Sequence, residues 1–291
     1  MEAIAARIEA LIHEDVGRGI QALCAAARGG LFSAASAVAA TMRPKIGILT
    51  GFFVPAGTPP AAETDGPAGA ALMALGFTRA GLDCRVLTDP LCRDACLAAL
   101  AGAGLANAGR ANVPVDCGDG LAVWRAAGID WAIAIERCGR TADHTLRNMR
   151  GEQVAGIPLD DVFTAGPWRT VAIGDGGNEV GMGALPTGLV AAHVAFGEKI
   201  ACITPANHLI VAGVSHWGAY ALLAALAAVR ADWRSALLSA LDPVTDLAIL
   251  EALVTNGPAV DGVTLRRAPT IDGVDMAVHR AKLLAIRATV H

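Results

Sequence analysis

The stretch "RTVAIGDGGNEVGMG", residues Arg169–Gly183, decides the fold because a short apolar run leads directly into a glycine-rich loop. The run 169–175 predicts a buried strand, since continuous apolar character is typical of strands that are covered on both faces. The loop that follows carries two carboxylates, Asp175 and Glu179, and no cation. A strand that ends in such a loop predicts an α/β sheet with a ligand site at its edge.

The same pattern of strand and helix recurs along the chain. Further strands are predicted at 45–53, 83–89 and 130–136, with a fifth at 199–204 or 208–213. Helical stretches are predicted at 69–82, after Asp89-Pro90, and at 121–128. This alternation predicts an α/β fold in which a mostly parallel sheet has helices on both faces, a three-layer α/β/α arrangement. We expect a single domain over residues 1–291, with residues 1–44 as an N-terminal helical cover.

Composition excludes several classes of protein. The chain is 54% hydrophobic and 17% charged, with a net charge of −4 and no basic block, so we expect no nucleic-acid partner. Its seven cysteines are scattered and odd in number, which argues against a disulfide framework. The N-terminus lacks a basic region followed by an apolar run, so we expect a cytoplasmic protein.

One segment imitates a membrane span. Residues 209–229 carry no formal charge unless His216 is protonated. They are rich in alanine, and Gly213, Ser215 and Gly218 interrupt the apolar run. This composition favours a buried strand, turn and helix over a span, so we expect no membrane association.

The glycine-rich loop does not fit phosphate binding. Glu179 stands where a dinucleotide fingerprint has its third glycine, and Met182 follows Gly181 where a Walker loop has lysine. Carboxylates on a glycine turn instead suit a hard divalent cation, Mn²⁺ or Mg²⁺ first and Ca²⁺ as a further option. The alternative is a tight strand-to-helix turn capped by Asp175 or Asn178.

Other polar residues follow the predicted strands. Glu63 and Asp65 lie in "PAAETDGPAGA", residues 60–70, and would form a four-carboxylate cluster with Asp175 and Glu179 if the two loops are neighbours. The segment 136–151 carries four arginines, which bind carboxylates and phosphates through a bidentate fork. Carboxylates for a cation together with arginines predict an anionic small-molecule ligand at the carboxyl ends of the strands.

Six motifs, in this order, resemble the D-glutamate cyclase family, in its C-terminal domain: "TGFFVP", "ETDGPAGA", "ERCGR", "NMRG", "IGDGGNEVGMG" and "IVAGVSHWGAYAL". The resemblance runs from about residue 46 to the tail. It implies an α/β fold, conversion of D-glutamate to 5-oxo-D-proline and water, and divalent-metal binding in some relatives. The sequence departs from the family at His216, where asparagine is usual, and at His144 and Leu146, where glycine and tyrosine are usual.

The motifs and the family resemblance together predict the following roles. The metal ligands are Asp65, Asp175 and Glu179, and the acid/base residue is Glu63 or Glu136, with His208 and His216 as alternatives. The substrate-binding residues are Thr50, Gly51, Arg137, Arg140, Asn148, Arg150, Gly176, Gly177 and Asn178.

Two other functions remain open from the sequence. The first is a metal-dependent phosphatase or other hydrolase that acts on a small anion, because the same residues would bind a phosphate. The second is a non-catalytic sensor of an acidic metabolite. In each case the expected partner is a small molecule, and assembly into a homo-oligomer stays open.

Overall fold

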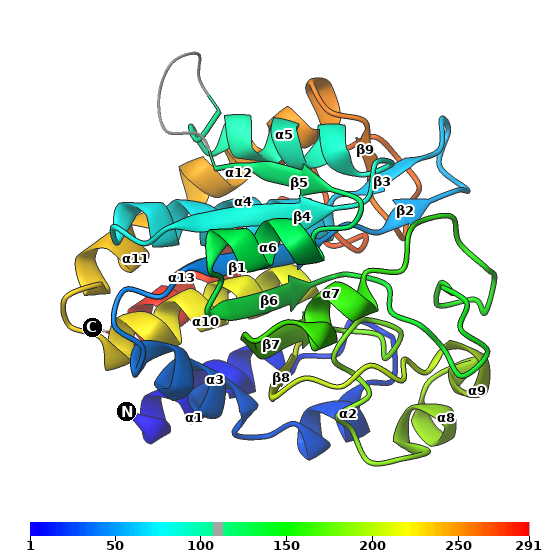
Figure 1. Cartoon of the computed structure of the whole chain (residues 1–291), viewed down its shortest axis with the longest axis horizontal. Coiled ribbons are helices and arrows are strands. Elements are labelled where there is room, and N and C mark those ends of the chain that lie inside the picture. The colour runs from blue at the N-terminus through cyan, green and yellow to red at the C-terminus, as the bar shows by residue number, and fades with distance from the viewer. Residues whose placement is uncertain (107–112, 291) are drawn as a thin grey trace.

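A computed structural model describes residues 1–106 and 113–290, and its centre is a six-stranded, all-parallel sheet (Figure 1). In the sheet the strands have the order β5-β4-β1-β6-β7-β8. Their bounds are β1 Ile46–Thr50, β4 Cys84–Thr88, β5 Val115–Cys117, β6 Trp131–Ile135, β7 Arg169–Gly174 and β8 His208–Val211. The predicted parallel sheet is therefore confirmed.

Successive side chains of each strand point into two separate apolar clusters. In β6, Trp131 and Ile133 join one cluster, whereas Ala132 and Ala134 join the other. Because strand side chains alternate between faces, two clusters of this kind mean that both faces of the sheet are buried. This explains why the strand sequences are continuously apolar.

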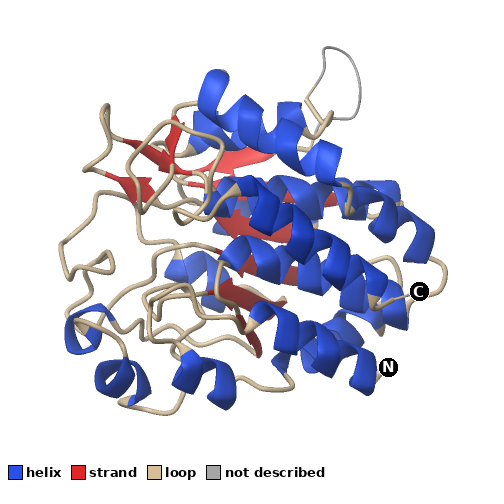
Figure 2. Cartoon of the chain, turned by 180° about the vertical axis from the view of Figure 1, so that it is seen from behind, coloured by secondary structure: helices blue, strands red, loops and turns tan. Residues whose placement is uncertain are grey.

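Helices cover both faces, which confirms the three-layer arrangement (Figure 2). The first face carries α1 Glu2–Ile12, α3 Gly30–Ala39, α4 Asp65–Arg79, α5 Arg93–Gly102, α10 Ser215–Val229, α11 Arg234–Ala240, α12 Pro243–Thr255 and α13 Met276–Ala288. The second face carries α2 Gln21–Ala26, α6 Leu121–Ala127, α7 Asp160–Ala165, α8 Leu189–His193 and α9 Gly197–Ile200. Residues 209–229 form β8, a turn and α10, as predicted. None of the helices in residues 1–106 and 113–290 is both long and apolar enough to cross a membrane.

The order of the strands places a crevice at one point of the sheet. The chain passes from β1 to β4 and β5, then returns to the other side of β1 to form β6, β7 and β8. The direction of winding therefore reverses between β1 and β6. In open parallel sheets, ligands bind beyond the carboxyl ends of the strands at such a reversal.

The structure differs from the sequence prediction at residues 45–53, and it selects one of the two candidates for the fifth strand. The predicted strand 45–53 ends at Thr50, because Gly51 has a φ of 108° and turns the chain away. Phe53–Val54 instead forms β2 of a small second sheet with β3, Ala61–Glu63, and β9, Ala259–Val260. The fifth predicted strand is β8, whereas the alternative segment 199–204 begins inside α9 and continues as loop.

Candidate active site

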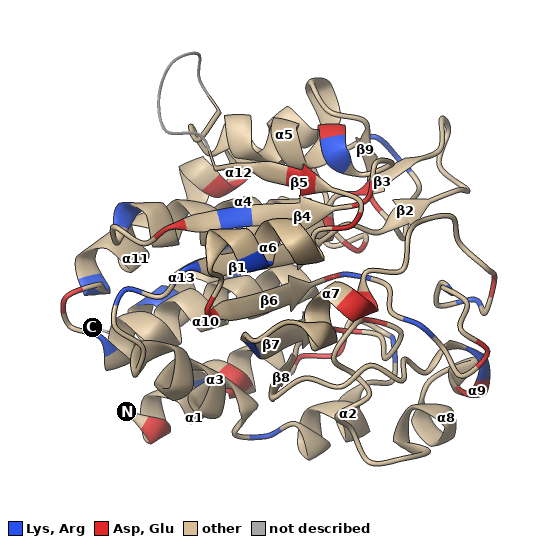
Figure 3. Cartoon of the chain, viewed as in Figure 1, with Lys and Arg blue, Asp and Glu red and all other residues tan. Residues whose placement is uncertain are grey.

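Three buried carboxylates meet beyond the carboxyl ends of the strands. Glu136 follows β6, Asp175 follows β7, and Asp65 begins α4. One carboxylate oxygen from each residue lies within 4.8 Å of one from each of the other two. Charged segments gather among the loops beyond the arrowheads of β6 and β7 (Figure 3). We call Asp65, Glu136 and Asp175 the carboxylate trio.

The backbone around the trio is shaped to bring these groups together. Glu136 has a φ of 42°, a left-handed conformation that is uncommon outside glycine and that concentrates at functional sites. Gly66 lets the first turn of α4 approach the strand ends, because a Cβ there would lie 2.6 Å from Thr50 Oγ1 and 3.0 Å from the Glu136 carbonyl oxygen. A side chain at position 66 would therefore push Asp65 away from Glu136.

The N-terminus of α10 holds the trio from the other side. The backbone N–H of Ser215 donates to Asp65 Oδ2 at 3.1 Å and to Asp175 Oδ2 at 2.8 Å, and its hydroxyl donates to Glu136 Oε2 at 2.7 Å. The positive end of a helix macrodipole favours negative charge at this position. Ser215 therefore fixes one oxygen of every member of the trio.

The electrostatics of the trio call for a positive ligand. Burial raises the pKa of Asp65, Glu136 and Asp175 well above the usual range, and the neighbouring carboxylates raise it further. Asp65 Oδ1 is buried and makes no hydrogen bond to any described residue. The guanidinium of Arg18, 3.0 Å from Asp175 Oδ2, opposes the increase in pKa at Asp175, but one positive charge does not neutralise three carboxylates, and a bound cation would favour their ionised forms. A set of carboxylate oxygens, one of which has no hydrogen-bond partner among the described residues, suits a hard divalent cation.

Glu63 lies beside the trio, and its pKa is raised as well. It ends β3, and burial raises its pKa to about 8, with a further increase from Asp272. The small second sheet is what brings this carboxyl group to the site.

Glu179 is bound to the glycine-rich loop itself. Its Oε1 accepts the N–H groups of Asp175 at 3.0 Å and Gly176 at 2.6 Å, and its Oε2 accepts that of Gly177 at 2.7 Å. Gly177 has a φ of 99°, which favours glycine and lets its N–H turn inward. These bonds favour a role in bracing the loop over the metal-ligand role predicted from the sequence.

A cavity of about 190 Å³ opens onto this cluster. Glu63, Glu136, Asp175 and Glu179 border it, and Asn148, Arg150 and Asn178 form one wall. Asn178 donates its amide to the Arg147 carbonyl at 2.9 Å, and Asn148 donates to Glu152 at 2.8 Å. Apolar side chains line much of the remainder: Phe52, Val54, Pro55, Met149, Val263 and Leu265.

The three predicted substrate-binding arginines have different surroundings. Arg137 is buried, pairs with Asp89 at 2.6 Å and also donates to the carbonyls of Gly51 and Ile157. Arg140 pairs with Asp161 and does not border the cavity. Arg150 borders the cavity, is exposed, and its guanidinium makes no hydrogen bond or ion pair within the described part of the chain.

Other predicted residues lie behind or away from the cavity. Thr50 is buried and donates its hydroxyl to the Ile135 carbonyl at 2.9 Å. His208 begins β8, at the opposite end of that strand, and contacts Ser33 and Arg169. His216 is buried with its Nε2 2.7 Å from Asp246.

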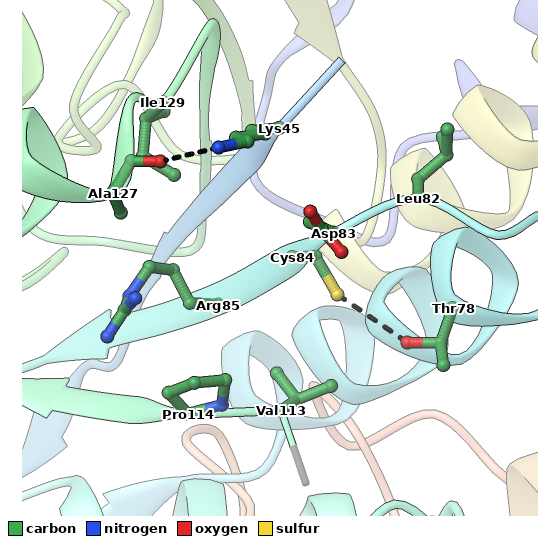
Figure 4. A pocket seen from close by; sticks show the side chains of 10 residues that line it. All are labelled: Lys45, Thr78, Leu82, Asp83, Cys84, Arg85, Val113, Pro114, Ala127 and Ile129. Carbon is green, nitrogen blue, oxygen red and sulfur yellow. Dashed lines mark hydrogen bonds between the residues drawn. The ribbon is translucent and has the colours of Figure 1, made fainter. Parts of the chain in front are cut away.

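A larger cavity, of about 360 Å³, lies at the opposite end of the sheet (Figure 4). It is bordered by Lys45, which precedes β1, and by Asp83 and Cys84 at the start of β4. Lys45 donates to the Ala127 carbonyl, and the Cys84 sulfur lies 3.7 Å from Thr78 Oγ1. None of the charged residues described in its lining is buried, so size alone does not make this cavity the better candidate.

Comparison with known proteins assigns the chain to a family. Residues 8–287 match the family described as "D-glutamate cyclase-like, C-terminal". The chain belongs to this family. It is also 42% identical over 103 residues to a human protein named "D-glutamate cyclase, mitochondrial", a match that covers 33% of this chain and 17% of the human protein.

One solved structure that is similar to this chain is that of RecJ in complex with Mn²⁺ from Thermus thermophilus. It has 14% sequence identity and a TM-score of 0.32, and the match covers 99% of this chain and 43% of that one. A likeness with this TM-score carries no inference about fold or function.

The positions at which this chain departs from the D-glutamate cyclase-like pattern lie outside the cavity. His144 is exposed, and Leu146 is buried in a small apolar cluster with Phe52, Cys138 and Val154. Neither borders the cavity, and His216 lies behind Ser215 in α10. None of these three positions therefore borders the cavity.

The sequence analysis missed several residues of the site, among them Ser215, Arg18 and Asp272. Arg18, between α1 and α2, borders the cavity and its Nη1 lies 3.0 Å from Asp175 Oδ2. Asp272 pairs with Arg18 from the loop before α13. Arg18 lies in "EDVGRG" and Asp272 lies in "IDGVD", but each of these stretches is equally typical of an ordinary polar turn.

Proposed function

We propose that this site converts D-glutamate to 5-oxo-D-proline and water with the help of a divalent cation, Mn²⁺ or Mg²⁺, held by Asp65, Glu136 and Asp175. The observation that carries the proposal is the buried carboxylate trio in a chain of the D-glutamate cyclase-like family. The proposal replaces Glu179 with Glu136 among the ligands, because the oxygens of Glu179 already accept backbone N–H groups.

The reaction makes three demands on the site. The α-amine must lose a proton, the γ-carboxylate must become electrophilic, and the chain must bend toward a ring. A divalent cation supplies the second, because it neutralises and polarises a carboxylate as a Lewis acid. The protein must supply the other two.

Glu63 is suited to proton transfer. A carboxyl group with a pKa of about 8 accepts a proton from an amine more readily than an ordinary glutamate does, and it can return that proton to the leaving oxygen. A bound dication would lower this pKa toward neutrality. Glu63 borders the cavity, so it is placed to act on a ligand there.

The cavity walls are suited to a small anion. A volume of about 190 Å³ is below the roughly 300–1,000 Å³ of pockets for drug-sized ligands and fits an amino acid. The exposed fork of Arg150 can bind the α-carboxylate at the mouth, and holding that end would fix the bent conformer.

Proton NMR tests the proposal. D- and L-glutamate are incubated with the purified protein and Mn²⁺, with and without chelator. Lactam ring signals should appear from the D-enantiomer and be lost with chelator. If instead aryl phosphates release phosphate far faster than D-glutamate turns over, the site is a phosphatase and the cyclase proposal fails.

A further inference from the structure

A hydrogen-bonded turn holds the backbone of Arg18 in place. The carboxylate of Asp15 accepts the backbone N–H groups of Gly17, Arg18 and Gly19 at 2.8–2.9 Å. These bonds fix the backbone of residues 15–19 between α1 and α2. The N-terminal segment therefore delivers one arginine to the carboxyl ends of the strands in a fixed direction.

The guanidinium of Arg18 is fixed as well. Asp272 binds it in a bidentate pair, with Nη1 at 3.0 Å from Oδ2 and Nη2 at 2.5 Å from Oδ1. Nη1 also donates at 3.2 Å to the carbonyl of Gly213, which lies two residues after the end of β8. Arg18 thus bridges three segments that are far apart in the sequence, and its Nη1 also forms an ion pair with Asp175 at 3.0 Å.

One edge of the guanidinium is left without a partner. Asp272 occupies the edge formed by Nη1 and Nη2. The other edge, formed by Nε and the second N–H of Nη2, makes no hydrogen bond to any described residue. The side chain is 16% exposed and borders the cavity. Such an edge binds a carboxylate with two parallel hydrogen bonds, and its rigid geometry distinguishes arginine from lysine.

We propose that Arg18 is a specificity-determining residue that binds the substrate carboxylate nearest to the trio, so that a ligand with two carboxylates spans from Arg18 to Arg150. This inference deepens the proposed function and rests on it for the identity of the substrate. The helices α1, α2 and α3 contribute no cavity residue, so Arg18 is the contribution of the first 44 residues to this cavity as far as the structure describes it.

The test uses glutarate, a five-carbon dicarboxylate that has no amine and cannot cyclise. Its affinity for the full chain with Mn²⁺ is measured by calorimetry in the wild type and in Arg18→Lys. The lysine keeps the positive charge but loses the fork, so glutarate affinity should fall at least about tenfold while Mn²⁺ affinity stays within about twofold. The matched control is Arg28→Lys, an exposed arginine of the same segment, which should change neither affinity.

Two results would overturn the inference. One is glutarate affinity that is unchanged in Arg18→Lys, or no glutarate binding to the wild type at all. The other is an equal loss of Mn²⁺ affinity, which would mean that Arg18 acts only through Asp175. Should Arg18→Lys fail to fold, Asp272→Asn releases the guanidinium from its bidentate partner and should weaken glutarate binding in the same way.

The outcome is separable from that of the cyclase proposal. If D-glutamate is not turned over but Arg18→Lys still weakens glutarate, the cyclase proposal fails and the carboxylate site stands. If D-glutamate is turned over and Arg18→Lys binds glutarate normally, the cyclase proposal stands and the role of Arg18 is refuted.

Discussion

Two glutamates of the site should respond differently to replacement by glutamine. Glu136→Gln and Glu179→Gln each replace a buried carboxylate by a neutral group of the same shape. Glu136 faces other carboxylates and accepts one hydrogen bond, from Ser215. Glu179 accepts three backbone N–H groups from its own loop. We therefore expect the first substitution to weaken metal binding and the second to destabilise the fold.

The magnitudes follow from these contacts. In Glu179→Gln the amide oxygen can keep the bonds of Oε1, but its NH₂ group then faces the N–H of Gly177. Leaving that donor unsatisfied costs about 1–3 kcal/mol of unfolding free energy. In Glu136→Gln the repulsion within the trio is relieved, so the metal-free protein should be as stable as the wild type or more so. Loss of one charged ligand should weaken Mn²⁺ binding by about tenfold or more, which is about 1.4 kcal/mol.

The assay combines two measurements on each variant. Unfolding in urea with chelator gives the stability of the metal-free protein, and calorimetry gives the Mn²⁺ affinity. Glu251→Gln, on the exposed surface of α12, is the control for removal of a charge and should leave both quantities unchanged.

The reverse pattern would refute the reasoning. If Glu179→Gln loses Mn²⁺ binding at full stability and Glu136→Gln keeps it, Glu179 is the metal ligand that the sequence predicted, and its bonds to the loop are secondary.

Three further outcomes are expected. Arg137→Lys should lower the unfolding free energy by about 2 kcal/mol in urea, because a lysine cannot reach Asp89 and two carbonyls at once; an unchanged midpoint would contradict this. Arg150→Ala should leave stability within about 0.5 kcal/mol but raise the KM for D-glutamate about tenfold, whereas an unchanged KM would place the α-carboxylate elsewhere. Burial lowers the pKa of His279 to about 4, and the Trp217 N–H donates to its Nδ1, so protonation of this ring is opposed in the folded state. The unfolding free energy should therefore fall by roughly 2 kcal/mol from pH 7 to pH 5, as measured by urea titration at each pH. His279→Gln should remove this part of the pH dependence.

The sign of the His279 effect follows from linkage. The folded pKa lies below the ordinary value of 6.5, so the unfolded chain binds the proton first as the pH falls. The contribution to stability is complete above pH 6.5 and is lost as the pH decreases toward 4. A slope that His279→Gln leaves unchanged would assign the acid sensitivity to other groups.

The sequence by itself determined the sheet and the end of it where the site lies. Runs such as 131–135 and 171–173 are apolar at every position, which favours cover on both faces and therefore helical crossovers between parallel strands. Because parallel strands all end at one edge, the sequence placed Glu136 and Asp175 at the same edge of the sheet, and the pairing of β6 with β7 makes them neighbours. The family resemblance followed from local motifs in the same loops, and the family match confirms it.

Only the tertiary structure decided which carboxylates face one another and which are already bound. Glu136 and Glu179 are equivalent as residue types, and the difference between them is the set of N–H groups that the folded glycine loop presents. Likewise, Arg137 is occupied because Asp89 follows β4, which lies on the other side of β1 from β6, so this pairing depends on strand order. Arg18 and Asp272 lie at opposite ends of the chain, and their contact depends on how the terminal segments close over β8. Local sequence patterns carry periodicity and turn chemistry, but long-range pairing of charges is fixed only when the packed layers bring those residues together.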